Sequence, residues 1–116
     1  MNYDHCPCSG NTLPRLVKPA IMALLLKEPQ HGYVLVQRLG EMAMFRGQAP
    51  DAGGVYKALR ELEESGMVVS EIEAGERGLG RKVFSLTAGG RGCCLKWHST
   101  LGDYRDALDE LLALLK

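Results

Sequence analysis

The sequence predicts a mainly α-helical protein with a small β-hairpin, arranged as a winged helix-turn-helix domain followed by a C-terminal dimerisation helix. Two observations predict this fold. Three helical segments precede two short alternating segments with a glycine-rich turn between them, which is the element order of a winged helix-turn-helix. The end of the chain then repeats apolar residues in alternating steps of three and four, which is typical of a helix that packs against a partner helix.

Length and composition favour one small domain. The chain has 116 residues, with 14 basic and 14 acidic side chains, so any nucleic-acid binding depends on an uneven distribution of charge. The longest apolar run, AIMALLL, is too short to span a bilayer, which takes about 20 residues. The N-terminal residues carry an acidic group and lack the apolar run of a secretory signal. We therefore expect a cytoplasmic protein.

The predicted organisation has three parts. Residues 1–13 contain His5, Cys6 and Cys8 without any helical or strand periodicity, and are expected to form a cysteine-containing arm. Residues 14–87 form the winged helix-turn-helix domain, and residues 88–116 form the C-terminal dimerisation helix.

Two helices are expected before residue 45. The first has Pro19 in its first turn, where the missing N–H costs nothing, and continues to Pro29, which ends it. The second runs from about His31 to Met44, and its buried stripe is Leu35, Leu39 and Met42. His31 is either a pH-sensitive group or, more simply, a residue that caps or packs at this helix start.

The third helix has one apolar and one basic face. Pro50 and Asp51 give start signals, the helix runs to about Ser65, and Gly66 suits the left-handed position after its end. At about 100° per residue, one arc gathers the apolar residues Val55, Ala58, Leu59 and Leu62. The opposite side carries Gly53, Tyr56, Lys57 and Arg60.

A β-hairpin follows, with strands within residues 67–74 and 81–87 and a glycine-rich tip. Arg77, Arg81 and Lys82 lie on or beside the tip, so the hairpin presents positive charge. Thr87 can cap the last helix, although glycines at 89, 90 and 92 are expected to weaken its first turns.

The last helix carries a heptad stripe over three repeats. It consists of Cys94, Trp97, Leu101, Tyr104, Leu108, Leu111 and Leu115. A stripe of this length on the last helix of a small domain predicts packing against a second chain. The residues from Trp97 to Leu115 are therefore the candidate dimerisation residues.

Three blocks of the sequence resemble the signature blocks of PadR-type transcriptional regulators: PQHGYVLVQRL, GGVYKALRELEESGMV and GRKVFSLTAGGRG. They occur in the expected order, and the resemblance covers roughly residues 14–116. It implies a homodimer, joined through the C-terminal helix, that binds a palindromic operator and usually acts as a repressor released by a small ligand. The N-terminal arm and GGRGCCLKW depart from the family pattern. Both departures involve cysteine, which leaves the inducing signal open.

Double-stranded DNA is the partner that these features favour. Gly53 and Gly54 would let the backbone approach a phosphate, while Tyr56, Lys57 and Arg60 would enter the major groove. Arg77, Arg81 and Lys82 of the hairpin would contact phosphates or a minor groove. In the alternative, the basic residues are an ordinary solvated face, and the protein is a dimeric helical interaction module that does not bind DNA.

Further sites are hypotheses with simpler alternatives. Trp97 could stack on a planar effector, or it could be only the largest side chain in the helix packing. The thiol and imidazole groups of His5, Cys6, Cys8, Cys93 and Cys94 could bind Zn²⁺ or another soft metal, could form a redox switch, or could be inert. No arrangement of nucleophile, base and oxyanion donors is evident, so an enzyme is not expected.

Overall fold

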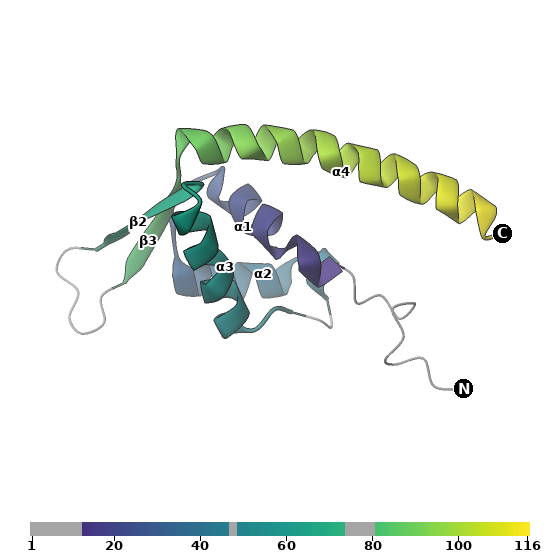
Figure 1. Cartoon of the computed structure of the whole chain (residues 1–116). Helices are drawn as coiled ribbons and strands as arrows, with labels where there is room; N and C mark the ends of the chain where they lie inside the picture. Colours follow the sequence, from purple (N-terminus) through teal and green to yellow (C-terminus); the bar gives the residue numbers. More distant parts are fainter. Residues whose placement is uncertain (1–12, 47–48, 74–80) are drawn as a thin grey trace.

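The computed structural model describes residues 13–46, 49–73 and 81–116. The elements are η2 (Leu13–Leu16), α1 (Val17–Leu25), β1 (Gln30–His31), α2 (Gly32–Glu41), η3 (Ala43–Phe45), α3 (Ala52–Glu64), β2 (Val68–Ile72), β3 (Lys82–Leu86) and α4 (Ala88–Leu114), where η denotes a 3-10 helix (Figure 1). The predicted fold, mainly helical with a small antiparallel sheet, is confirmed.

Helix α1 ends earlier than the sequence suggested. It starts at Val17, so Pro19 still lies in its first turn, and it ends at Leu25 instead of reaching Pro29. A proline disfavours helical geometry in the residue that precedes it, and Gln30, directly after Pro29, already pairs with Phe84 in the sheet. The chain must therefore leave the helix before Pro29.

Helix α2 is shorter than expected. It ends at Glu41, because Met42 adopts an extended conformation, and the separate 3-10 turn η3 follows. Within this arrangement Phe45 is completely buried, as are Leu35 and Leu39 of the predicted stripe, while Met42 is partly buried against them. The prediction that this helix continues to Met44 was therefore wrong. The break at Met42 directs Phe45 into the core.

Helix α3 has the predicted boundaries. The Asp51 carboxylate accepts a 2.6 Å hydrogen bond from the N–H of Gly54 and so caps the helix. At the other end Gly66 has a φ of +78°, a left-handed conformation that glycine adopts without steric cost. The start signal at Asp51 and the stop signal at Gly66 are both confirmed.

The sheet has three strands in the order β1-β3-β2, where the sequence predicted only a two-stranded hairpin. Strands β2 and β3 pair antiparallel, with Ser70 opposite Phe84. The additional strand β1 places Gln30 opposite Phe84 on the other side of β3. It is two residues long, too short to show any alternation. Through β1, the start of α2 is attached directly to the wing.

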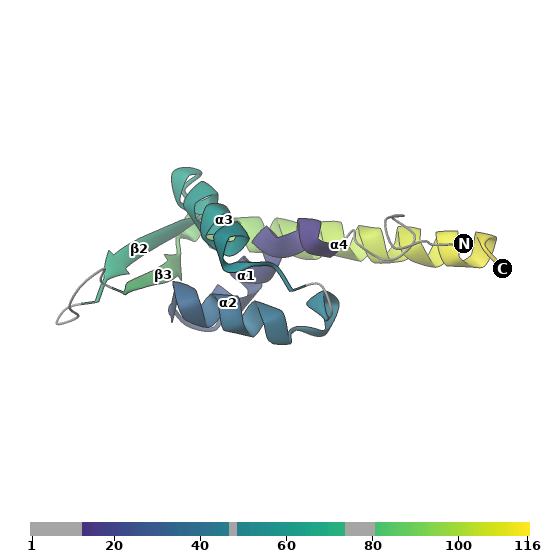
Figure 2. The same cartoon turned by 90° about the horizontal axis from the view of Figure 1, so that it is seen from below.

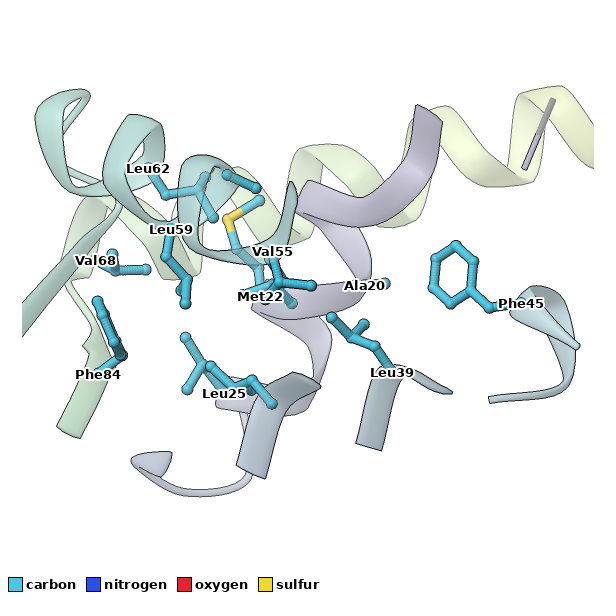
Figure 3. Close-up of a cluster of buried hydrophobic side chains, with 13 residues drawn as sticks. Ala20, Met22, Leu25, Leu39, Phe45, Val55, Leu59, Leu62, Val68 and Phe84 are labelled. Carbon is cyan, nitrogen blue, oxygen red and sulfur yellow. The ribbon is translucent and has the colours of Figure 1, made fainter. Parts of the chain in front are cut away.

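One hydrophobic core joins the three helices, η3 and the sheet. In Figure 3, Met22, Val55 and Leu59 lie near its centre, with Phe84 at the sheet end and Phe45 at the opposite end. The buried apolar residues are Ala20, Ile21, Met22, Leu25, Leu35, Leu39, Phe45, Val55, Ala58, Leu59, Leu62, Val68 and Phe84. The predicted apolar face of α3 thus forms part of this core.

Helix α4 runs past the rest of the domain, and its C-terminal half projects beyond it in both views (Figures 1 and 2). The Thr87 hydroxyl caps it by accepting from the N–H of Gly90 at 2.9 Å. The first turns, which the sequence suggested were weak, form a regular helix. A Cβ at position 90 would lie 2.1 Å from the carbonyl oxygen of Met67. Glycine here allows α4 to approach the residue that precedes β2.

Candidate nucleic-acid interface

The basic face of α3 is exposed, as its pattern predicted. Gly53, Gly54, Tyr56, Lys57 and Arg60 are all exposed, whereas the apolar residues between them are buried. Helix α3 is thus held by one side and presents the other to solvent. The structure divides the outward residues between its two flanks.

Lys57 lies on the flank that faces the start of α1. There it lines a shallow cavity together with Arg15 and Lys18. Lys18 donates a 3.1 Å hydrogen bond to the carboxylate of Glu61, one turn beyond Lys57. This bond, and the positive charge of Lys18, lower the pKa of Glu61. The cavity on this flank is thus lined by three cations, Arg15, Lys18 and Lys57, and by two carboxylates, Asp51 and Glu61.

The two glycines at the start of α3 differ in their surroundings. The N–H of Gly54 already donates to Asp51, and a Cβ at position 54 would approach that carboxylate to 2.9 Å. A Cβ at position 53 would have its nearest neighbour at 3.8 Å. Gly54 is thus part of the helix cap, whereas Gly53 leaves open backbone on the outer side of the helix.

Tyr56 and Arg60 lie on the other flank, facing α2 and the wing. The ring of Tyr56 lies so close to Gly32, the first residue of α2, that a Cβ there would be 2.7 Å from the ring. Tyr56 nevertheless keeps 44% of its surface exposed. It packs against a neighbouring helix on one side and remains accessible on the other.

At the base of the wing, Arg81 is held against α2. Its guanidinium carbon lies 5.3 Å from the centre of the Tyr33 ring, and its Nη1 donates to the Tyr33 hydroxyl at 3.4 Å. Lys82, the first residue of β3, is exposed beside it. Arg77, which the sequence assigned to the same surface, lies outside the described residues.

A second contact joins α2 to the wing. The Nε2 of His31 lies 2.6 Å from a carboxylate oxygen of Glu73. His31 is the residue before α2, yet its side chain forms no capping hydrogen bond. Of the two simpler roles expected for it, capping was therefore wrong, but packing at the helix start is confirmed: its ring lies 5.5 Å from that of Tyr33, centre to centre.

Tyr33 and Gly32 were missed as site residues. Both belong to the His-Gly-Tyr segment of PQHGYVLVQRL. Their position at the start of a helix does not indicate which other element of the fold they face. Only the three-dimensional arrangement shows that α2, α3 and β3 surround one cavity of about 470 Å³. The predicted residues Tyr56, Arg60, Arg81 and Lys82 all line it.

The apolar stripe of α4 changes character along the helix. Cys94 and Trp97 are partly buried against the core of their own chain, whereas Tyr104, Leu108, Leu111 and Leu115 are 50 to 75% exposed. The stripe from Trp97 to Leu111 and the η2 residues Leu13 and Leu16 line a groove of about 790 Å³. This groove is largely apolar, with Arg15 and Arg105 also lining it.

The described cysteines, Cys93 and Cys94, are adjacent on α4 and partly buried. Burial raises the pKa of the Cys94 thiol, and the neighbouring Cys93 adds to this shift. Thiolates are the form that binds metals and reacts with oxidants. Among the described residues no three His, Cys, Asp or Glu side chains are grouped to hold a metal. His5, Cys6 and Cys8 lie outside the described residues.

The sequence matches the family model of the transcriptional regulator PadR-like family over residues 21–94. No curated protein sequence matches it significantly. In the part of the chain that the structure describes, no helix is long and apolar enough to cross a lipid bilayer.

Solved structures with the same fold include regulators from several organisms. A candidate transcriptional regulator from Thermoplasma acidophilum is 32% identical, with a TM-score of 0.73 over 87% of this chain and 94% of the other. A PadR family regulator from Clostridium difficile has 20% identity and a TM-score of 0.72, over 84% and 98% of the two chains. PadR of Bacillus subtilis, solved in complex with operator DNA, has 23% identity and a TM-score of 0.63 over 72% of this chain and 46% of that one.

Proposed function

Because the chain belongs to the transcriptional regulator PadR-like family, we propose that it is a homodimeric, sequence-specific DNA-binding regulator whose α3 enters the major groove of an operator. The observation that carries this proposal is the meeting of α3 and the wing around one basic surface. Tyr56 and Arg60 of α3, and Arg81 and Lys82 of the wing, line a single cavity. The operator complex of the B. subtilis protein supports DNA as the partner.

The test is a gel shift with the DNA upstream of the protein's own coding region, using matched charge reversals. Lys57→Glu places a carboxylate on the outer face of α3, where it would repel phosphates, and should abolish the shift. Lys96→Glu makes the same change in charge on an exposed part of α4 and should leave the shift intact. No shift with the wild-type protein would favour the alternative, a dimeric interaction module that does not bind DNA. Equal binding by both variants would remove Lys57 from the DNA interface.

Dimerisation through α4 is part of the proposal. Leu101, Tyr104, Leu108, Leu111 and Leu115 form the exposed stretch of the stripe, and an apolar patch of this kind is usually covered by a partner. A two-fold dimer would present two α3 helices to two half-sites of an inverted repeat. The proposed division therefore assigns residues 14–87 to DNA binding and residues 88–116 to dimerisation, with residues 1–13 as a separate arm.

We further propose that the protein is a repressor relieved by a small ligand bound near Trp97, which lines the groove beside η2. Trp97 is the only tryptophan of the chain, so its fluorescence reports on that site alone. Planar cationic or phenolic compounds should quench it and weaken operator binding. Absence of quenching across the series would remove this ligand site from the account.

Relief by a metal or redox signal is the other route consistent with the four cysteines. Burial raises the pKa of the Cys94 thiol, so less of it is present as the thiolate, the form that binds metals and reacts with oxidants. Metal analysis of the full chain, purified under reducing conditions, tests the metal branch. Close to one equivalent per chain would support it, and a content near zero would reject it.

A further inference from the structure

The cavity between α2, α3 and the wing has the lining of an anion site. Its volume is about 470 Å³, and its lining includes Tyr33, Tyr56, Arg60, Glu63, Arg81 and Lys82. Three of these side chains are cations and one is a carboxylate. Arginine presents several N–H donors in a planar fork that matches phosphate oxygens. The cavity therefore combines an excess of positive charge with directional hydrogen-bond donors.

The carboxylate in the cavity is itself bonded. Glu63 accepts a 2.7 Å hydrogen bond from the Ser70 hydroxyl on β2. This bond ties the end of α3 to the wing, and the lining of the cavity contains three cations and this one carboxylate. The Glu63 carboxylate still repels any anion in the cavity, because accepting a hydrogen bond does not remove its negative charge.

Tyr33 holds one of the cations in place. Its ring lies under the Arg81 guanidinium at 5.3 Å, and its hydroxyl accepts a hydrogen bond from the same group at 3.4 Å. The phenol is 44% exposed, so its hydroxyl can also donate to a ligand. Tyr33 lies in the first turn of α2, outside both α3 and the wing to which the basic surface was assigned.

We propose that this cavity binds one backbone phosphate of the operator, with Tyr33 acting both as a direct contact and as a positioning residue for Arg81. The proposal rests on the proposed DNA-binding function. It adds a third element, α2, to the interface, and it assigns one phosphate per half-site to one set of side chains. Glu63 in the same cavity weakens this contact.

The experiment uses the full chain and a duplex selected for binding, in which backbone phosphates are replaced one at a time by neutral methylphosphonates. The wild-type protein should lose about tenfold in affinity when the phosphate in the cavity is replaced, as expected for a charge-assisted hydrogen bond. Tyr33→Ala and Arg81→Ala should bind the unmodified duplex more weakly and lose little more at that position. Arg81→Ala should also reduce the slope of log K against log salt by about one unit.

Three further variants separate the contact from a folding defect. Tyr33→Phe keeps the ring under Arg81 but removes the hydroxyl, so it should fall between wild type and Tyr33→Ala. Glu63→Gln removes the repelling charge and should bind the unmodified duplex more tightly than wild type, which a misfolded variant would not do. Arg38→Ala removes an arginine of α2 that is paired with Glu28 at 3.8 Å and should leave the methylphosphonate profile unchanged.

Failure of the DNA-binding function and failure of the cavity proposal give different results. If the wild-type protein binds no duplex, the proposed function fails. If it binds, but Tyr33→Ala and Arg81→Ala show the wild-type methylphosphonate profile, the cavity proposal is overturned and the DNA-binding function stands.

Discussion

Gly90 and Gly92 lie two residues apart on α4, yet only one of them has room for a side chain. A Cβ at position 90 would lie 2.1 Å from the Met67 carbonyl oxygen, whereas a Cβ at position 92 would meet nothing within 4 Å. Gly90→Ala should therefore destabilise the fold by roughly 2–3 kcal/mol through steric overlap. Gly92→Ala should stabilise it by about 0.5–1 kcal/mol, since alanine restricts the unfolded chain and favours helix.

Urea denaturation at one protein concentration compares these two variants directly. If both glycines were required only for flexibility, both substitutions would shift stability in the same direction. That result would contradict the close approach of α4 to the turn before β2.

The ion pair of Lys18 and Glu61 gives a pH-dependent prediction at the same scale. The hydrogen bond from Lys18 lowers the pKa of Glu61 from its ordinary value of 4.5. The pair therefore contributes stability above pH 4.5 and loses it as the pH falls through the lower, folded-state pKa. Lys18→Met should lower the thermal midpoint slightly at pH 7, because both side chains are nearly half exposed. The difference should disappear in strongly acidic buffer; a constant difference would assign the effect to packing.

At the scale of the elements, the sequence predicted the helix caps and faces that are determined by neighbouring residues in the chain. The caps Asp51 and Thr87 and the left-handed Gly66 follow from the preferences of single residues, and each lies where the pattern put it. The apolar face of α3 was predictable for a related reason, because helical spacing alone determines which residues share a side.

The elements that sequence could not predict depend on a distant partner. Strand β1 is two residues long and exists because Gln30 and His31 pair with β3, more than 50 positions later in the chain. The end of α2 is similar, since the break at Met42 becomes understandable only when Phe45 is seen in the core. The role of Tyr33 also depends on Arg81 of the wing.

The exposed stripe of α4 makes a prediction about assembly. Leu108 lies within it and Ala113 lies on the opposite side of the helix, and both are exposed in the single chain. Leu108→Lys should convert the proposed dimer to monomers, because it buries an unpaired charge at the interface. Ala113→Lys, which adds the same charge, should leave the mass unchanged in analytical ultracentrifugation. Dissociation by both variants, or by neither, would argue against this face as the interface.

At the scale of the whole molecule, charge placement matters more than charge balance. The chain has as many basic as acidic residues, yet Arg60, Arg81 and Lys82 meet around one cavity and Lys57 lies on the adjoining flank of α3. Helix α4 extends away from this surface. DNA binding and dimerisation are thus proposed for separate surfaces, and a dimer would present two copies of the basic surface together.

The central claim is that two such surfaces read an inverted repeat, and selection of bound DNA from a random duplex pool tests it most directly. The full chain should enrich a palindromic sequence whose half-site centres are about 10 base pairs, one helical turn, or a multiple of that apart. Repeating the selection with added Zn²⁺ also asks whether metal changes binding. Failure to enrich any sequence under both conditions, or enrichment of one unrepeated half-site, would contradict the account.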